Sequence, residues 1–327
     1  MIITRTPYRV SLFGGGSDYP IWYKENGGEV VSFAIDKFCY LTTRVLPPFF
    51  NHKYRIAYSK VETTQSIAEI QHPAVKGALS KYCSDLSLEI HHDGDLPARS
   101  GVGSSSAFAV GLIHSLFKLR GKEFTPSSLA QNAIELEQID LKENVGSQDQ
   151  IACALGGLNH IVFGGSQEWK ATAIKTSLEY REELEERMVL IYTGVNRLSS
   201  NIQEGLLSGI QTKSKALSRT IELTKECKII LETKSDLNLI GEMLAESWSL
   251  KKSMNPNAVT PILDEIWSKS QSAGALGGKI LGAGGGGFCL FWVQEGKRED
   301  FLRRFSMGTS VPIKIEDSGS TCIFESA

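Results

Sequence analysis

The chain has 327 residues, a length typical of about two domains, and 41% of them are apolar, enough for a sizeable core. Its formal net charge is only −2, which excludes a broad basic surface, so we expect no nucleic-acid partner. The six cysteines are scattered without a CxxC pair and no apolar run reaches membrane-spanning length, so we expect no disulfide framework, no zinc site, no membrane partner and a cytoplasmic location.

The first half of the chain predicts strands and turns, followed by helices that alternate with strands. Around Val10 and Leu12 the apolar alternation predicts a strand that ends in a glycine turn, and the β-forming run 30–45 predicts another strand. We then expect a helix over 66–83, a strand over 86–91, and helices over 104–120 and roughly 126–142. The last of these helices begins with Thr125 as its cap and Pro126 at its first position.

The second half predicts strands over 158–163 and 187–193, a helical and charged stretch from 199 to about 274, and strands over 279–282, 288–293 and 312–316. This order of elements indicates an α+β chain. The composition shifts around 164–167, where glycines and a serine follow a predicted strand. We therefore predict one domain over residues 1–165 and a second over residues 166–327.

The segment 96–107, Leu-Pro-Ala-Arg-Ser-Gly-Val-Gly-Ser-Ser-Ser-Ala, predicts an anion site. It follows a predicted strand and opens a predicted helix, where glycines allow close approach and the N–H groups and helix dipole favour negative charge. We interpret it as a phosphate loop, with the binding residues Ser100, Gly101, Val102, Gly103, Ser104, Ser105 and Ser106. The alternative is a plain helix cap, which accounts for one serine and one glycine but not for the whole set.

A second glycine run, 282–287, matches the GxGxxG dinucleotide fingerprint in its letters only. That fingerprint needs a helix after its glycines, whereas here Phe288–Val293 reads as a buried strand. We interpret the run as a turn between two strands where something comes close to the backbone; the alternative is an ordinary tight hairpin. The chain contains neither the GxxxxGK[ST] motif nor the HRD and DFG motifs of protein kinases.

Three carboxylates stand out by their positions. Asp18 follows the first glycine turn, where it either accepts hydroxyl groups of a sugar or belongs to an Asx turn. Glu137 shares a predicted helix face with apolar residues, which is rare for a carboxylate unless it is paired or binds a metal; the alternative is that it lies at the edge of that face. Asp149 lies where a loop enters a helix, and taken alone it reads as an N-cap.

Three segments in this order resemble the GHMP kinase superfamily, which includes galactokinase, homoserine kinase and mevalonate kinase. They are 7–18 (Pro-Tyr-Arg-Val-Ser-Leu-Phe-Gly-Gly-Gly-Ser-Asp), the phosphate loop, and 279–287, and they span nearly the whole chain. Within the superfamily, segments 14–18, 146–150, 192–197 and 250–252 are most similar to the D-glycero-D-manno-heptose 7-phosphate kinases. Galactokinases usually carry a Glu-His pair where this chain has Gly15 and Gly16.

The resemblance implies a role for each residue that matches a motif. Asp149 and Arg9 would be catalytic, Ser105 and Glu137 would bind Mg²⁺, and the phosphate loop would bind ATP. The remaining positions would bind the substrate, namely Gly15, Gly16, Asp18, Arg197, Gly284, Gly285 and Gly286. A phosphate already on the sugar needs its own cation, for which the candidates are Arg197, Lys251 and Lys252, unless these are ordinary solvated charges.

The resemblance also implies a fold and a reaction. We expect an N-terminal domain like domain 2 of ribosomal protein S5 and a ferredoxin-like α+β C-terminal domain. The expected reaction uses ATP and Mg²⁺ to phosphorylate the anomeric hydroxyl of D-glycero-D-manno-heptose 7-phosphate, which gives the 1,7-bisphosphate for nucleotide-activated heptose in surface glycans. The expected partner is this small sugar phosphate. A homodimer is a further possibility.

Two alternatives to this reaction remain. One is a kinase of the same family for another sugar, such as fucose or galactose. The other is a regulator that binds a ligand without catalysis, and the presence of Asp149, Glu137 and Ser105 argues against it.

Overall fold

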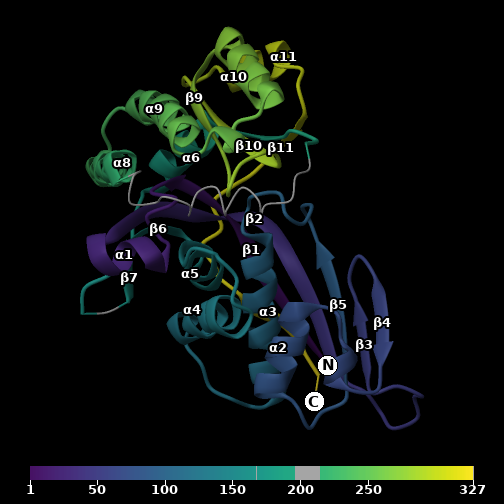
Figure 1. The fold of residues 1–327 in the computed structure, drawn as a ribbon. Coiled ribbons are helices and arrows are strands. Elements are labelled where there is room, and N and C mark those ends of the chain that lie inside the picture. The colour runs from purple at the N-terminus through teal and green to yellow at the C-terminus, as the bar shows by residue number, and fades with distance from the viewer. Residues whose placement is uncertain (167, 196–213, 327) are drawn as a thin grey trace.

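The computed structural model describes residues 1–166, 168–195 and 214–326 of the chain. Two β-sheets organise these residues, and each has helices packed against it (Figure 1). The larger sheet has eight strands and contains both ends of the chain. Its outer strand β12 (Thr321–Glu325) pairs antiparallel with the N-terminal strand β1 (Ile2–Phe13).

The larger sheet is built around two long strands, β1 and β2 (Gly28–Val45), which pair antiparallel over most of their length. Across the sheet the order is β12-β1-β2-β5-β3-β4, and β6 pairs with the first part of β2 and with β7. The remaining strands of this sheet are β3 (Tyr54–Ala57), β4 (Val61–Thr64), β5 (Leu88–Gly94), β6 (Leu158–Phe163) and β7 (Trp169–Ala173).

The helix α3 (Ser104–Leu119) forms the centre of the first core. It packs against β1 and β2, and its residues 106–117 are all buried, because other helices cover the face that points away from the sheet (Figure 1). The other helices on this part of the chain are α1 (Pro20–Asn26), α2 (Pro73–Tyr82), α4 (Pro126–Glu135) and α5 (Gln148–Leu155), with a short 3-10 helix, η1 (Ile67–Glu69).

The smaller sheet has the order β11-β8-β10-β9 and is antiparallel throughout. Its strands are β8 (Met188–Tyr192), β9 (Ala275–Ile280), β10 (Phe288–Val293) and β11 (Thr309–Val311). The helices of this half of the chain are α6 (Leu178–Arg187), α8 (Ser214–Thr233), α9 (Asn238–Met254), α10 (Pro261–Ala273) and α11 (Arg298–Arg304), with a 3-10 turn η4 (Pro256–Ala258). Of these, α8 packs against α9 and against β1 and β2 of the larger sheet. If the four strands are numbered 1 to 4 in chain order, their order across the sheet is 4-1-3-2. Helices connect the first strand to the second and the third strand to the fourth. This is the ferredoxin-like arrangement, so the fold expected for this part of the chain is confirmed.

Several predicted elements are confirmed with small shifts of their ends. The predicted strand over 158–163 is β6, and the predicted helix over 104–120 is α3. Thr125 caps α4 by accepting the Ser128 N–H at 3.1 Å. The predicted helix over 66–83 becomes regular only at Pro73, because a residue before proline is pushed out of the helical region and His72 is extended, with φ −69° and ψ 110°.

One local prediction is refined and another is wrong. The helix expected over roughly 126–142 is present, but only its first part is the α-helix α4, and a π-helical turn, Leu136–Asp140, continues it. The strand expected over 312–316 makes only an isolated bridge, between Ile315 and Ile35. Pro312 at its start has no N–H group for a strand ladder, and the regular strands β11 and β12 lie on either side of it.

The helical stretch expected from 199 to 274 corresponds to α8, α9 and α10, and its first part, up to residue 213, lies outside the described residues. β7 and β12 lie beyond residue 165 in the chain and join the larger sheet. The boundary between residues 165 and 166 stays a prediction.

His114 on α3 gives the fold a pH dependence. Its ring is buried, and Nδ1 lies 2.9 Å from the Ser320 hydroxyl, next to β12. Burial, and then the charge of Lys118, lowers the pKa of His114 from 6.5 to about 4. Because the folded state prefers the neutral ring, this contribution to stability is complete above pH 6.5 and is lost as the pH falls toward 4.

We expect the His114→Asn variant to lose less stability on acidification than the wild type, by up to about 3 kcal/mol near pH 4. Asparagine keeps a polar group near Ser320 but does not take up a proton. The measurement is urea denaturation of both proteins from pH 7 to pH 4. A difference in the free energy of unfolding that does not change with pH would contradict this account.

Candidate active site

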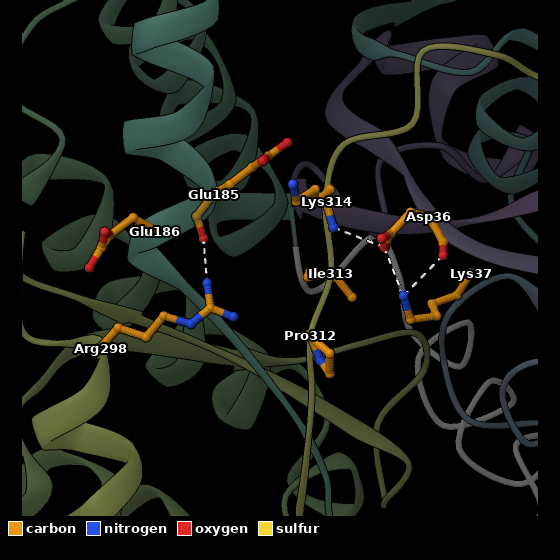
Figure 2. Close-up of a pocket in the computed structure, with 8 residues that line it drawn as sticks. All are labelled: Asp36, Lys37, Glu185, Glu186, Arg298, Pro312, Ile313 and Lys314. Atoms are coloured by element: carbon orange, nitrogen blue, oxygen red, sulfur yellow. Dashed lines mark hydrogen bonds and ion pairs between the residues drawn. The ribbon is translucent and has the colours of Figure 1, made fainter.

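A surface pocket of about 370 Å³ contains none of the predicted site residues. It is lined by Asp36, Lys37, Glu185, Glu186, Arg298, Pro312, Ile313 and Lys314 (Figure 2). Its charged groups bind one another: Lys37 Nζ donates to Asp36 Oδ1 at 3.0 Å, and Arg298 Nη1 donates to the Glu185 carbonyl at 3.0 Å. The predicted site lies elsewhere, around the phosphate loop.

The phosphate loop leaves the amino end of α3 without a side-chain cap. Gly103 stands at the N-cap with φ +74°, a conformation that favours glycine. Two serine hydroxyls stabilise the loop itself: Ser100 Oγ donates to the Pro97 carbonyl at 2.6 Å, and Ser104 Oγ accepts the Arg99 N–H at 3.0 Å. The first N–H groups of a helix have no acceptor within it, so this end offers donors and a positive dipole to an anion.

The glycine turn 282–287 lies directly against the phosphate loop. The Phe288 N–H donates to the Ser100 carbonyl at 2.9 Å, and a Cβ atom at Gly282 would lie 2.6 Å from Gly101 Cα. The prediction that something comes close to this backbone is therefore confirmed, and what comes close is another part of the same chain.

The middle of the same turn packs against two other segments of the second half. The Gly285 N–H donates to the Ala258 carbonyl at 2.7 Å, and Gly284 also contacts Ala258. Gly286 lies against the Val195 carbonyl. The positions predicted to bind substrate, Gly284, Gly285 and Gly286, thus face protein backbone on at least one side.

Gly101 should be the most sensitive position in this contact. It has φ +88°, and a Cβ atom there would lie 2.6 Å from the Leu281 carbonyl oxygen. We expect Gly101→Ala to push the phosphate loop away from the glycine turn and to lower kcat/KM for ATP about tenfold or more, since the strain costs about 1–3 kcal/mol. Steady-state kinetics with ATP as the varied substrate measure this.

Gly121→Ala is the matched control, because Gly121 has φ +59° and nothing lies within 4 Å of its Cβ position. This variant also places an alanine in the left-handed backbone region, but its Cβ atom does not collide with another part of the chain. Equal losses of kcat/KM in the two variants would show that the contact between the loops does not matter for activity.

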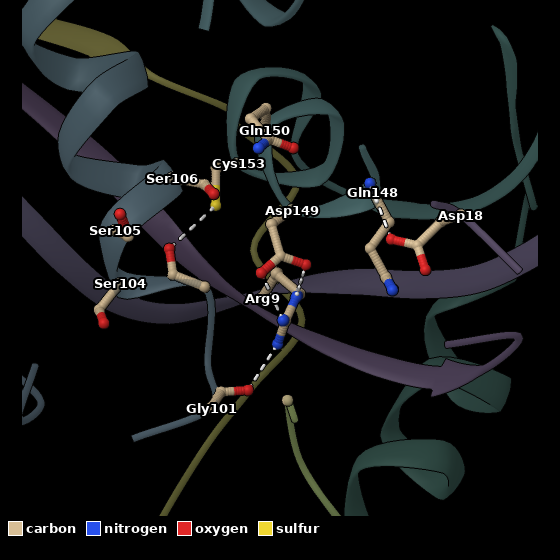
Figure 3. Close-up of polar contacts among 12 residues, drawn as sticks. Arg9, Asp18, Gly101, Ser104, Ser105, Ser106, Gln148, Asp149, Gln150 and Cys153 are labelled. Carbon is tan, nitrogen blue, oxygen red and sulfur yellow. Dashed lines mark hydrogen bonds and ion pairs between the residues drawn. The ribbon is translucent and has the colours of Figure 1, made fainter. Parts of the chain in front are cut away.

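Arg9 of β1 and Asp149 of α5 form a two-point ion pair, in which Arg9 is buried and Asp149 is partly exposed (Figure 3). Arg9 Nε donates to Asp149 Oδ1 at 2.6 Å, and Nη2 donates to Oδ2 at 2.5 Å. Burial lowers the pKa of Arg9, but the charge and hydrogen bonds of Asp149, together with the charge of Asp18, raise it above its ordinary value, so the guanidinium stays charged. Arg9 Nη1 also donates to the Gly101 carbonyl at 2.7 Å, which joins the ion pair to the phosphate loop.

Such a carboxylate is suited to orienting a hydroxyl group more than to acting as a strong base, because both of its oxygens already accept hydrogen bonds from a cation. Phosphoryl transfer passes through a loose transition state that needs positioning and charge stabilisation more than proton abstraction. The N-cap reading of Asp149 is wrong: it lies inside the first turn of α5, and Ser147 is at the cap.

Asp18 joins the glycine turn after β1 to the start of α5. It is 1% exposed, its Oδ1 accepts the Gly16 N–H at 3.0 Å, and its Oδ2 accepts the Gln148 N–H at 3.3 Å. Burial, and then the negative charge of Asp149, raises the pKa of Asp18, while these hydrogen bonds lower it.

Glu137 is buried at 1% exposure, so it does not lie at the edge of its helix face. It lies in the π-helical turn, and its carboxylate accepts the Ser105 and Ser106 hydroxyls, each at 2.8 Å, and the side-chain amide of Gln150. Burial raises the pKa of Glu137 to about 7, although the three hydrogen bonds lower it. π-helical turns are rare and are frequent at functional sites.

The surroundings of Glu137 suit a divalent cation. None of the hydrogen-bond partners given above carries a positive charge, and Gln150 Oε1 is buried beside it without a partner in the part of the chain that the structure describes. Ser105 is exposed and brings a hydroxyl oxygen. The described residues contain no cluster of three or more His, Cys, Asp or Glu side chains for a metal, so Mg²⁺ here would take its other oxygens from phosphates and water.

The three residues predicted as candidate cations for the phosphate of the sugar differ in where they lie and what they bind. Lys251 is partly buried, and its Nζ donates to the carbonyls of Ile280 at 2.8 Å and Gly282 at 2.6 Å, so it holds the glycine turn 282–287 in place. Lys252 is exposed and pairs with Asp264 at 2.6 Å, which fits a solvated charge. Arg197 lies outside the described residues.

Sequence reasoning missed three residues of this region. Lys279 is buried and donates to the Leu12 carbonyl at 2.9 Å, which connects β9 to the end of β1. Burial, and then the charges of Lys251 and Arg9, lowers its pKa. Gln148 and Gln150 flank Asp149 and contact Asp18 and Glu137. An amide on each side of the predicted catalytic residue is the signal that could have found these two.

Two protein-family models match parts of this chain. The GHMP kinases N terminal domain matches residues 70–157, and the GHMP kinases C terminal domain matches residues 221–306. These ranges contain the phosphate loop, Glu137 and Asp149 in the first and the glycine turn in the second. The chain belongs to the GHMP kinase family.

Its relatives include sugar kinases. It is 27% identical to D-glycero-alpha-D-manno-heptose 7-phosphate kinase from Campylobacter jejuni, over 92% of each chain. It is 24% identical to the bifunctional fucokinase/GDP-fucose pyrophosphorylase of Arabidopsis thaliana, over 91% of this chain and 30% of that protein. A similar solved structure is a D-glycero-D-manno-heptose 1-phosphate kinase from Bacteroides thetaiotaomicron, with a TM-score of 0.81, 24% identity and full coverage of both chains.

These findings define the protein as a sugar kinase of the GHMP family, a phosphotransferase that acts on a sugar hydroxyl with ATP as the phosphoryl donor. Among the described residues, no helix combines the length and the apolar character needed to span a membrane.

Proposed function

We propose that the protein phosphorylates the anomeric hydroxyl of D-glycero-D-manno-heptose 7-phosphate and gives the 1,7-bisphosphate. The observation that carries this proposal is the likeness to a heptose 7-phosphate kinase along 92% of both chains. The glycines at positions 15 and 16 support it, because the Glu-His pair typical of galactokinases is absent.

In this proposal, Arg9 and Asp149 position the reacting hydroxyl. Asp149 accepts a hydrogen bond from the hydroxyl and so orients it. The hydroxyl oxygen bonds to the γ-phosphorus while the bond from that phosphorus to the β,γ-bridging oxygen breaks and ADP leaves, and Asp149 takes up the hydroxyl proton late in this step. Arg9 keeps the carboxylate in place and adds positive charge beside the transferring group, between Asp149 and the Gly101 carbonyl. Asp18 holds the glycine turn 14–16 against the start of α5, because it accepts the N–H groups of Gly16 and Gln148.

The phosphate loop binds the donor in the same proposal. N–H groups over 101–106 hold the β- and γ-phosphates at the uncapped end of α3. Ser105 and Glu137 would hold Mg²⁺, which supplies neutralisation of the charge that develops on the phosphate oxygens. The chain has no lysine of the GxxxxGK[ST] type in this loop, so the neutralising charge has to come from Arg9 and this cation site.

A second candidate function is a kinase for an unphosphorylated sugar such as fucose. It is favoured by the fucokinase of Arabidopsis and by the L-fucokinase/L-fucose-1-P guanylyltransferase of Bacteroides fragilis, which is 26% identical over 89% of this chain. Both of those proteins are much longer, since the matched part is 30% and 34% of their length.

The test is ATP turnover over a panel of sugars: heptose 7-phosphate, unphosphorylated heptose, fucose, galactose and mannose. The proposal predicts the highest kcat/KM for heptose 7-phosphate, by about 100-fold or more over the unphosphorylated sugar, because a bound phosphate contributes several kcal/mol. A preference for fucose would favour the second candidate. Binding of a sugar with no turnover of any would favour a regulator without catalysis.

A further inference from the structure

Two buried polar groups beside the glycine turn 14–16 have no hydrogen-bond partner within the described part of the chain. They are Ser11 Oγ, on β1, and Gln148 Oε1, in the first turn of α5. Ser11 is 5% exposed and Gln148 is 6% exposed. An unpaired buried polar group is costly and needs an explanation, and two of them side by side at an exposed glycine point to a ligand that supplies the partner.

Gly15 lies next to both side chains, at the hydroxyl of Ser11 and at the nitrogen end of the Gln148 amide. A Cβ atom at Gly15 would be 3.7 Å from Ser11 Oγ and 3.8 Å from Gln148 Nε2, and Gly15 itself is exposed. The missing side chain therefore leaves a space that is open to solvent and reaches the hydroxyl and the amide together.

This space belongs to the same site as the ion pair. Ser11 follows Arg9 by two positions on β1, which places the two side chains on one face of the strand. Gln148 precedes Asp149, and Figure 3 shows its side chain extending between Asp149 and Asp18. A sugar whose hydroxyl reaches Asp149 can therefore place another of its groups beside Gly15.

We propose that Ser11 and Gln148 bind a second hydroxyl of the sugar in the space beside Gly15 and so determine which sugars are accepted. This rests on the proposed function in one respect, that the sugar reacts at Asp149. A hydroxyl both donates and accepts, and so it satisfies the serine and the amide together. Both side chains are neutral, which suits a hydroxyl; a phosphate would need a cation.

The first test replaces each polar group by an apolar one of similar size, in Ser11→Ala and Gln148→Met. We expect the KM for the sugar to rise about tenfold in each variant, the effect of one lost hydrogen bond, and the KM for ATP to stay within about twofold. The Tm of the free protein should stay equal or rise, because an unpaired buried group has been removed. A purely structural role predicts the opposite, a lower Tm with both KM values shifted together.

The second test fills the space, in Gly15→Ala. The contacts of its Cβ atom would be ordinary van der Waals distances, so the Tm should not fall while the KM for the sugar rises. Thr176→Val is the control, because it removes another buried hydroxyl without a described partner, in the segment between β7 and α6. It should leave both KM values unchanged.

The kinetics use the sugar of the panel that the wild type phosphorylates fastest. If the wild type prefers fucose, the heptose assignment is overturned, but the KM of each variant for the sugar can still be compared with that of the wild type. An unchanged sugar KM in Ser11→Ala, Gln148→Met and Gly15→Ala would overturn the inference. A wild type that phosphorylates none of the sugars would contradict the inference and the proposed function together.

Discussion

Replacement of Asp149 by asparagine is expected to lower kcat by about 10²–10⁴-fold, the range typical for loss of a positioned proton acceptor. The amide keeps the size of the side chain, but it cannot take the proton of the sugar hydroxyl and it leaves Arg9 without a countercharge. KM for ATP should change little, because the phosphate loop holds its own geometry through Ser100 and Ser104. The measurement is steady-state turnover with saturating sugar and ATP.

Loss of the carboxylate also leaves a buried guanidinium unpaired, which costs about 3–5 kcal/mol, so folding is checked by Tm in the same preparation. Asp149→Glu is the second variant: it keeps the charge for Arg9 but displaces the carboxylate, and it should be folded and still slow. Asp317→Asn removes the acid of an exposed Arg–Asp pair and should leave kcat unchanged. A folded Asp149→Asn protein with near-normal kcat would remove Asp149 from the chemistry.

Replacement of Glu137 by glutamine should have the second-largest effect. We expect the Mg²⁺ concentration for half-maximal activity to rise about 10- to 100-fold, with kcat also lower, because the proposed site would lose the one carboxylate that the described residues offer it. The hydrogen bonds with Ser105, Ser106 and Gln150 can rearrange around an amide. Since a buried carboxylate without a cation is costly, the metal-free variant should be at least as stable as the metal-free wild type.

A titration of activity with Mg²⁺ at fixed ATP measures this, and Tm values in EDTA give the stability. Glu123→Gln is the control, an exposed carboxylate between α3 and α4. If the Mg²⁺ requirement is the same in the Glu137→Gln variant and in the wild type, the cation site lies elsewhere.

The parts of the fold that depend on local sequence could be predicted. Thr125 and Pro126 mark the start of α4, and the alternation around Val10 marks β1, because caps and periodicity act over a few residues. The π-helical turn after Glu135 could not be predicted from periodicity, since one shifted hydrogen-bond register leaves the residue pattern almost unchanged. Glu137 lies in that turn, on the buried face that the helical spacing had indicated.

The parts of the site that depend on contacts between distant segments needed the structure. The resemblance to GHMP kinases names Arg9 and Asp149 separately, but the pairing of both Asp149 oxygens by Arg9 joins residues 140 positions apart. Lys251 looked like a ligand for phosphate because it is basic, and it instead binds two backbone carbonyls. Ser11 carries no signal in the sequence, because a hydroxyl on a strand becomes notable only when it is found buried and unpaired.

The most direct test of the central claim is the ³¹P NMR spectrum of wild-type protein with ATP, Mg²⁺ and D-glycero-D-manno-heptose 7-phosphate. The account predicts conversion of ATP to ADP and a new phosphate signal coupled to the anomeric proton, beside the retained signal of the 7-phosphate. Unchanged ATP, or a new phosphate on any other carbon of the sugar, would contradict it.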